Sequence, residues 1–462
     1  MGRRVLVSIV SAAVAAAAAT SAAALPGVPR VPLATDTAFS RMASFRADSP
    51  APVVGASAFA GQGRLAFVSA GKLYVLDGSA PGRQATLDRV PAPVGVVAPA
   101  FSPDGQWLAF LVTKASSYPQ VAYYTGTLWL ARADGSDAHP VLANASTFAW
   151  SPARDVLAVT VYPPRDSALP ELYELGPGMT PRRVPGASGP AAWSPDGREL
   201  AFASMSGRPP GRFTGLLETM PAAGGTPVIR YRSAGNALDL AGWWPAGGGL
   251  LAWIDFDSSA SLAADGLPLV SVPLVSGSLA GKPATLGTTL VYPAFVSVSR
   301  GAAVTAISAG DDRYEWDGKK ILLCAFTGGC TGLPAGSPGA TSTDPALSPG
   351  GKYLAFVHGA ASSPSDFGQV AVSTWYATRD LWLDTRATGQ VRRLAAAGSS
   401  VADPTWSANG QRLLYVRNDG LWLLNPAGGA PARIVASLFS GTWPNYYYYI
   451  DWPDQFAWYS KH

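Results

Sequence analysis

Histidine is scarce in this sequence, whose 462 residues include 3 His. His139, His358 and His462 are widely separated, whereas a zinc-type centre needs two or three such ligands close together. A Ser-His-Asp triad would have to use His358, but there is no Gly-x-Ser-x-Gly turn to present the nucleophile and no Gly-rich phosphate loop. The sequence therefore predicts no catalytic residues of these kinds and no metal site, and it favours a protein that is not an enzyme.

Charged residues are also few, at 14% of the chain, and the net charge is +4. Cleavage of an N-terminal signal would remove Arg3 and Arg4 and no acid, which lowers the net charge to +2. So small a positive balance does not support binding to nucleic acid or to an anionic membrane surface. We expect no nucleic-acid partner.

Long apolar runs are missing except at the N-terminus. There, the basic MGRR precedes VLVSIVSAAVAAAAA (residues 5–19) and the small residues SAAA (21–24), an order typical of a secretory signal peptide. An uncleaved anchor is the alternative, but the run is rich in Ala and short of the ~20 strongly apolar residues of a membrane span. We expect residues 1–24 to be cleaved and the protein to be exported to the periplasm, the cell envelope or the medium, with no integral membrane segment left.

The chain has 2 Cys, Cys324 and Cys330, within CAFTGGC. If ILLCAF and CTGLP are the two strands of a hairpin, the cysteines face each other and a cross-strand disulfide is geometrically allowed. Export favours a disulfide over free thiols. We expect a structural bond, since no His or second Cys pair accompanies it.

Turn-forming residues are abundant by contrast, with 50 Gly and 40 Pro between short apolar runs, which favours many short strands. One phrase recurs: an apolar residue, a Ser-Pro-Asp-Gly turn or a relative of it, and alternating apolar positions. Its copies are FSPDGQWLAF (101–110), WSPARDVLAV (150–159), WSPDGRELAF (193–202), LSPGGKYLAF (347–356) and WSANGQRLLY (406–415). Each copy predicts a strand, a tight turn and a strand, because Pro presets φ and Gly accepts a positive φ.

A second hairpin follows each phrase, as in LWLARADGSDAHPVL (128–142) and LWLDTRATGQVRRL (381–394). Four strands per repeat predict an all-β fold, a β-propeller of four-stranded antiparallel blades, because each unit buries both faces only against copies of itself. Eight such pairs can be traced, the first of them beginning with a hairpin at FAGQGRLAF (59–67), so we favour eight blades, with seven as the alternative. Tryptophans recur at shared positions (Trp150, Trp193 and Trp406; Trp129, Trp382 and Trp422), which predicts packing between blades.

The repeats predict a single propeller domain over residues 51–462, preceded by an N-terminal extension at 25–50. A last, unpaired copy, IDWPDQFAWYS (450–460), lies in the C-terminal segment 444–462. Terminal strands that return to the first blade close a propeller ring, so we expect this hairpin to close it against residues near 40–60.

The phrase resembles the TolB-type, WD40-like propeller repeat, which centres on a Ser-Pro-Asp-Gly turn and an Ala-Phe strand. The matching positions are Ser102-Pro103-Asp104-Gly105 with Ala109-Phe110, Ser194-Pro195-Asp196-Gly197 with Ala201-Phe202, and Ser348-Pro349-Gly350-Gly351 with Ala355-Phe356. The resemblance implies a propeller fold over about residues 51–460. TolB itself carries a separate α/β domain ahead of its propeller, for which the chain has no room, so its partner-binding role is not carried over.

Six links between the hairpins of a blade are long: residues 112–126, 161–170, 204–215, 255–266, 308–320 and 358–380. We call the propeller face that holds them the long-loop face. Loops of this length cost ordering entropy without building core, which predicts a working surface rather than solvated decoration, the alternative.

These loops are rich in aromatic and Arg side chains, the types that dominate protein interfaces. The candidate binding residues are Tyr118, Tyr123, Tyr124, Arg208, Arg212, Phe213, Arg313, Tyr314, Trp316, Trp375, Tyr376 and Arg379. The sequence thus predicts an exported, non-catalytic propeller that binds a protein partner through its long-loop face. A carbohydrate-binding module is an alternative, because exposed rings stack on sugars.

Carboxylates in the same loops leave a further alternative, a glycosidase or lyase with an acid and base pair. The loop carboxylates are Asp255, Asp257, Asp311, Asp312 and Glu315. Asp255, Asp257 and Ser259 also have the spacing of the start of a calcium loop, although the Gly and the late Glu of an EF-hand are missing. We therefore expect no cofactor, with calcium as the alternative.

Overall fold

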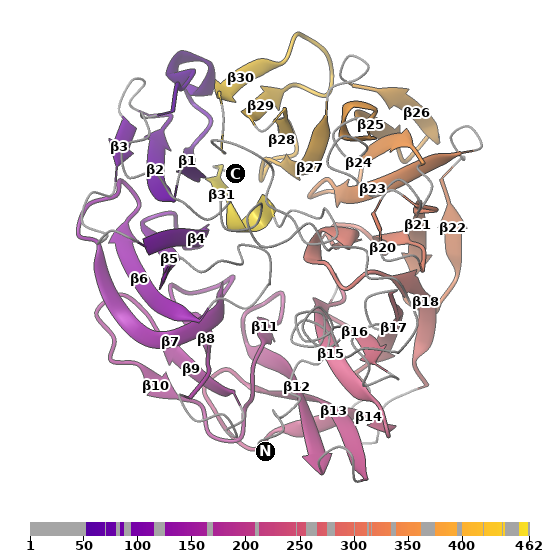
Figure 1. The fold of residues 1–462 in the computed structure, drawn as a ribbon. Helices are drawn as coiled ribbons and strands as arrows, with labels where there is room; N and C mark the ends of the chain where they lie inside the picture. The colour runs from indigo at the N-terminus through magenta and orange to yellow at the C-terminus, as the bar shows by residue number, and fades with distance from the viewer. Residues whose placement is uncertain are drawn as a thin grey trace, which may run out of the picture.

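The computed structural model describes residues 52–460, except for 70, 80–83, 87–93, 115–124, 164–169, 208–211, 246, 256–265, 275–281, 300, 312–313, 316, 334–338, 362–374, 395–399, 419, 437 and 439–451. Antiparallel sheets are arranged around a central axis, with one strand of each sheet nearest that axis (Figure 1). This arrangement confirms the predicted all-β propeller. Among the described residues, no helix combines the length and hydrophobicity needed to cross a membrane.

The sheets follow one another along the chain. The first holds β1 (Arg64–Ser69), β2 (Lys72–Asp77), β3 (Gln84–Thr86) and β31 (Phe456–Tyr459). The second holds β4 (Val94–Phe101), β5 (Trp107–Lys114), β6 (Gly126–Arg132), β7 (His139–Trp150), β8 (Leu157–Val161), β9 (Glu171–Leu175) and β10 (Arg182–Arg183). The third holds β11 (Ala191–Trp193), β12 (Glu199–Gly207), β13 (Phe213–Pro221) and β14 (Val228–Ala234).

Four more four-stranded sheets complete the ring. They hold β15 (Ala237–Trp243), β16 (Gly249–Asp255), β17 (Leu267–Pro273) and β18 (Ala284–Thr289); β19 (Val296–Ser297), β20 (Val304–Ala309), β21 (Lys320–Ala325) and β22 (Cys330–Gly332); β23 (Ala340–Leu347), β24 (Tyr353–Ala360), β25 (Asp380–Thr385) and β26 (Gln390–Arg393); and β27 (Val401–Trp406), β28 (Leu413–Arg417), β29 (Gly420–Leu424) and β30 (Ala432–Val435). Three short 3-10 helices are η1 (Ala56–Phe59), η2 (Pro293–Phe295) and η3 (Trp452–Asp454).

Strand β7 is long enough, at 12 residues, to belong to two blades. Its first part pairs with β6, where His139 lies opposite Leu130, and its last part pairs with β8, where Trp150 lies opposite Leu157. The seven-stranded sheet therefore divides at β7 into two four-stranded units. Together with the six four-stranded sheets of the described residues, this is consistent with the favoured count of eight blades.

The end of the chain closes the ring. β31 is the innermost strand of the first sheet and pairs antiparallel with β1, with Tyr459 opposite Arg64. Closure by the C-terminal segment is thus confirmed, but its partner is β1 rather than residues near 40–60. Residues 59–67, predicted as a hairpin, are instead the end of η1 and the start of β1, and this leaves the inner position free for β31.

The repeated turn forms as the sequence predicts. The Ser102 hydroxyl donates a hydrogen bond to Asp104 Oδ1 at 2.6 Å, and the backbone N–H of Gln106 donates to the same oxygen at 2.8 Å. Gly105 has φ +68°, a conformation that costs glycine little. The phrase is therefore a sequence for one tight turn between the two innermost strands of a blade.

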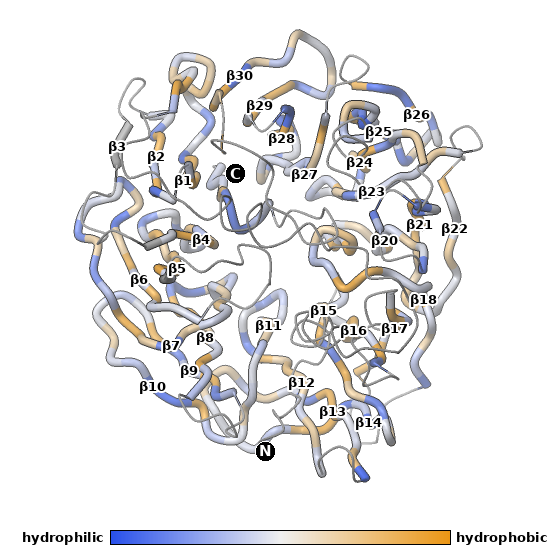
Figure 2. The backbone as a smooth tube through the Cα atoms, in the orientation of Figure 1, coloured by the Kyte–Doolittle hydropathy of each residue, from blue (hydrophilic) through white to orange (hydrophobic). Residues whose placement is uncertain are grey.

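Tryptophans join neighbouring blades. The indole Nε1 of Trp150, Trp193 and Trp406 donates to the backbone oxygen of Ala100, Ala149 and Ala346, at 3.0, 3.0 and 2.8 Å respectively. Each bond crosses from one inner strand to the previous one, so the predicted packing role is confirmed. Outer strands are more polar: β10 and β26 are blue in Figure 2 and largely exposed.

Cys324 and Cys330 form the predicted disulfide. They lie directly opposite each other on β21 and β22, with 4.0 Å between their Cα atoms. A disulfide of this kind suits an oxidising compartment.

Candidate functional site

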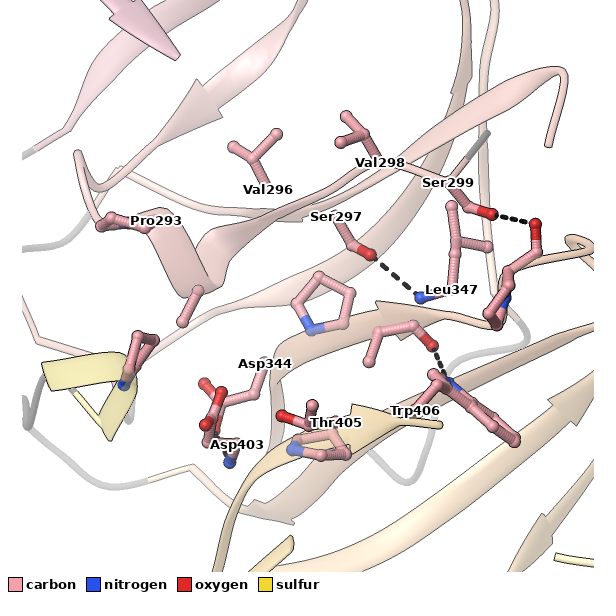
Figure 3. Close-up of a pocket in the computed structure, with 16 residues that line it drawn as sticks. Pro293, Val296, Ser297, Val298, Ser299, Asp344, Leu347, Asp403, Thr405 and Trp406 are labelled. Carbon is pink, nitrogen blue, oxygen red and sulfur yellow. Dashed lines mark hydrogen bonds between the residues drawn. The ribbon is translucent and has the colours of Figure 1, made fainter. Parts of the chain in front are cut away.

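A cavity of about 520 Å³ lies among the inner strands β19, β23 and β27, next to η3 (Figure 3). Its volume falls in the range of small-molecule sites, roughly 300–1,000 Å³. Much of the wall is apolar and comes from prolines and valines of four segments, including Pro293, Val298, Pro404 and Pro453. Cross-blade bonds support it, as where Ser297 Oγ accepts from the backbone N–H of Leu347 at 2.9 Å.

Asp344 and Asp403 are the only ionisable residues among the described residues that line this pocket. Each is followed by a proline, and each has a left-handed backbone, with φ +50° and +43°. Both lie at irregularities in the pairing of their strands, β23 with β24 and β27 with β28. Asp accepts this conformation better than most residues, and a bulge turns a side chain to a new direction.

The same backbone form occurs on β4 without a carboxylate. Ala98 has φ +54°, is followed by Pro99, and lies at the corresponding break in the β4–β5 pairing. The bulge is therefore a feature of the blade, and the acids are an addition made in only two neighbouring blades of these three.

Asp344 is held from behind by a buried arginine. Its Oδ2 accepts from Arg379 Nη2 at 2.8 Å and from the backbone N–H of Asp403 at 3.2 Å. Asp344 and Asp403 lie side by side in Figure 3. One carboxylate oxygen thus joins the arginine to the backbone of the next blade.

Arg379 itself is 2% exposed and lies within a buried charged cluster. Its Nη1 donates to Glu315 Oε1 at 3.2 Å, and the Tyr376 hydroxyl donates to the same oxygen at 2.8 Å. The rings of Trp375 and Tyr376 both pack against the guanidinium, with centroids 5.0 and 4.9 Å from its carbon. A buried charge is tolerated when it is paired and hydrogen-bonded in this way.

Burial changes the acidity of this cluster. Desolvation raises the pKa of Glu315 to about 7, although the charge of Arg379 opposes the shift. Desolvation also raises the pKa of Tyr376 well above 10.0, so that its hydroxyl stays protonated and donates to Glu315. Glu315 is thus the group in the cluster that titrates near neutral pH.

The structure describes half of the predicted binding residues. Tyr118, Tyr123, Tyr124, Arg208, Arg313 and Trp316 lie outside the described residues. Arg212 is exposed, and Phe213 and Tyr314 are half-buried. Trp375, Tyr376 and Arg379 are brought together, but they are 4%, 4% and 2% exposed and form no binding surface. The expectation that these three are exposed is wrong, because Glu315 and Asp344 from other segments bind the arginine inside the fold.

The structure describes three of the five loop carboxylates. Asp255 and Glu315 are buried, Asp311 is exposed, and Asp257, Asp312 and Ser259 lie outside the described residues. Within the part of the chain that the structure describes, no three His, Cys, Asp or Glu side chains form a metal-binding group.

Sequence reasoning missed Asp344 and Asp403. A signal was present, since TDPALSPGG and ADPTWSANG place an Asp-Pro pair ahead of the repeated turn, whereas the corresponding VAPAFSPDG has Ala98. The fold follows from what the copies of the repeat share, whereas the site lies where two copies differ from the others.

No protein-family model matches this sequence, and no curated protein matches it. Solved structures do match the fold. Dipeptidyl peptidase 4 from Porphyromonas gingivalis is 12% identical with a TM-score of 0.55, over 84% of this chain and 62% of that one. Apo prolyl oligopeptidase B from Galerina marginata is 11% identical with a TM-score of 0.49, over 75% and 51%. An oligogalacturonate lyase in complex with manganese is 13% identical with a TM-score of 0.42, over 81% and 85%.

This chain thus spans about half of the oligopeptidase and 62% of the dipeptidyl peptidase. The prediction of a non-catalytic propeller that binds a protein through its long-loop face is contradicted, because the dipeptidyl peptidase that matches the fold is an enzyme. Scarce histidine and missing motifs exclude particular chemistries within these residues. They do not exclude a propeller that serves an enzyme, and the likeness to the dipeptidyl peptidase shows the fold that the two share.

Proposed function

We propose that the pocket between the inner strands binds the amino-terminal end of a peptide, and that the propeller is the substrate-binding part of an enzyme. The observation that carries this proposal is the make-up of the pocket wall. Asp344 and Asp403 are the ionisable groups among the described lining residues, and no basic side chain lines it with them. A cationic ligand therefore suits the site.

The amino-terminal end of a peptide suits both the acidic and the apolar parts of the pocket wall. Its ammonium group has three donors and no acceptor, so it needs carboxylate and carbonyl partners when it leaves water. Its first side chains can cover apolar surface, and Val298 at the pocket is 47% exposed. Burial of apolar surface contributes roughly 25 cal/mol per Å².

Peptides are the substrate class suggested by the name of the dipeptidyl peptidase, whose fold is similar. At 12% identity that likeness supports the fold, and the substrate belongs to the proposal. We also propose that residues 1–24 are an export signal and that residues 51–462 form a single propeller. The Cys324–Cys330 disulfide is in keeping with export. Membership of the TolB-like group stays a prediction from the repeat.

Calorimetric titration with Ala-Pro-Ala and with its N-acetylated form tests the proposal. Acetylation removes the positive charge, and a hydrogen bond to a charged group contributes about 1.5–3 kcal/mol, so we expect an affinity at least about tenfold lower. Asp403→Asn should weaken binding of the free peptide and leave binding of the acetylated one unchanged.

Asp311→Asn is the matched control, because Asp311 is an exposed carboxylate that does not line the pocket. It should bind both peptides as the wild type does. Equal affinity of the wild type for the two peptides, or no binding of either, would overturn the proposal.

A further inference from the structure

We propose that Arg379 is a positioning residue for the pocket: its guanidinium holds the Asp344 carboxylate against the backbone of Asp403 and so fixes the two pocket acids relative to each other. The inference rests on the proposed function for its effect on binding. Its structural part can be tested without any ligand.

Arg379 does not line the pocket, so it acts through Asp344. Both bonds meet at one atom, since Asp344 Oδ2 accepts from Arg379 Nη2 at 2.8 Å and from Asp403 N at 3.2 Å. A carboxylate that turned away to solvent would lose both donors at once. The ion pair thereby keeps the oxygen at the junction of β23 and β27.

The arginine is itself held in one orientation. Glu315 accepts from Nη1, while the rings of Trp375 and Tyr376 pack against the guanidinium. Trp375 is fixed in turn by its indole N–H, which donates to the backbone oxygen of Ala360 at 2.6 Å. A site held by such a second layer keeps its geometry when a ligand arrives, which favours affinity.

The bulge on β4 shows what Arg379 adds. Ala98 adopts the left-handed backbone without a carboxylate, so the conformation of the strand does not depend on an ion pair. We therefore expect loss of Arg379 to move the Asp344 side chain and to break its bond to Asp403 N, while the bulge itself remains.

The test is a double-mutant cycle with Arg379→Lys and Asp344→Asn, titrated with Ala-Pro-Ala. Lysine keeps the charge but lacks the planar fork that reaches Glu315 and Asp344 together. We expect Arg379→Lys to weaken binding about tenfold in the wild type and less than about twofold in the Asp344→Asn background, because coupled residues are not additive. Independent losses of equal size in both backgrounds would overturn the inference, and so would wild-type affinity in a folded Arg379→Lys protein.

A crystal structure of Arg379→Lys separates this inference from the proposed function. If the wild type does not bind the peptide, the proposed function fails, and the contact between Asp344 Oδ2 and Asp403 N decides the positioning role. Its loss supports the role, and its retention at 3.2 Å overturns it.

Should Arg379→Lys not fold, Tyr376→Phe loosens the same cluster by removing one donor to Glu315. We expect Tyr376→Phe to weaken binding about threefold in the wild type, and we expect this loss to disappear in the Asp344→Asn background. Wild-type binding by Tyr376→Phe would then count against the inference.

Discussion

Strands β4 and β23 form the same backbone bulge, but the side chains at the two bulges differ. Ala98 and Asp344 have nearly equal φ, +54° and +50°, and each precedes a proline at the same break in strand pairing. On β4 the bulge carries a methyl group; on β23 it carries a carboxylate that is paired with Arg379. The comparison shows that the blade fold fixes the backbone conformation of the bulge, and that a single side chain at the bulge determines its chemistry.

The largest effect should come from removing the charge that supports Asp344. Arg379→Met leaves Glu315 and Asp344 buried without their cation, and breaking a buried ion pair costs about 3–5 kcal/mol of unfolding free energy. Urea denaturation measures it. Arg198→Met is the control, since the Arg198 side chain is 86% exposed, and it should leave the midpoint unchanged. Equal effects of the two changes would mean that the cluster around Asp344 resembles ordinary surface pairs.

A pH dependence of stability should follow from the same cluster. Burial raises the pKa of Glu315 from its ordinary 4.5 to about 7, while Arg379 and Lys319 oppose the shift, the Asp344 charge adds to it, and the bond from Tyr376 lowers it. The folded state therefore binds the proton more tightly than the unfolded state. This contribution, on the order of 3 kcal/mol, is complete below about pH 4.5 and is lost as the pH rises through about 7.

Thermal unfolding between pH 5 and 8 measures this slope, and Glu315→Gln should reduce it. Asp239 adds a slope of the same sign, because its own burial and the nearby charge of Asp255 raise its pKa to about 7. The double variant Glu315→Gln with Asp239→Asn should therefore lose the part of the slope that these two carboxyl groups cause. A wild-type protein that gains stability from pH 5 to 8 would contradict both assignments.

The smallest effect should come from adding an acid to the bulge that lacks one. Ala98→Asp places a residue that tolerates a left-handed backbone on β4, so we expect a change in stability within about 0.5 kcal/mol. We expect no second site for Ala-Pro-Ala, because Arg379 is the only buried arginine among the described residues. Calorimetric stoichiometry decides this, and two peptides bound per chain would show that the bulge and an acid are enough.

The fold could be predicted from the sequence because the same strand–turn–strand phrase recurs along the chain. Each copy of the phrase supplies its own turn and strand pair, and three of the five copies also supply an inter-blade tryptophan. An error in one copy, such as the hairpin expected at residues 59–67, therefore does not change the architecture. Closure was predicted in outline, but the partner was not, since pairing between β31 and β1 leaves no local pattern.

The candidate site could not be predicted in the same way. Trp375, Tyr376 and Arg379 are types that suit both an exposed interface and a buried cation packed against aromatic rings. What decides between these is Glu315 and Asp344, which lie 64 and 35 residues earlier in the chain. Only the folded structure shows that these segments meet.

Ring closure also sets the order in which the protein can be completed. The Trp458 indole N–H donates to the backbone oxygen of Gln62 at 2.7 Å, across 396 residues. The blade that contains β1 therefore lacks its inner strand until β31 is made. Contacts of such high sequence separation slow folding, and an unpaired β1 edge is open to pairing with other chains while it waits. The open edge of β1 is thus a site of possible aggregation until β31 pairs with it.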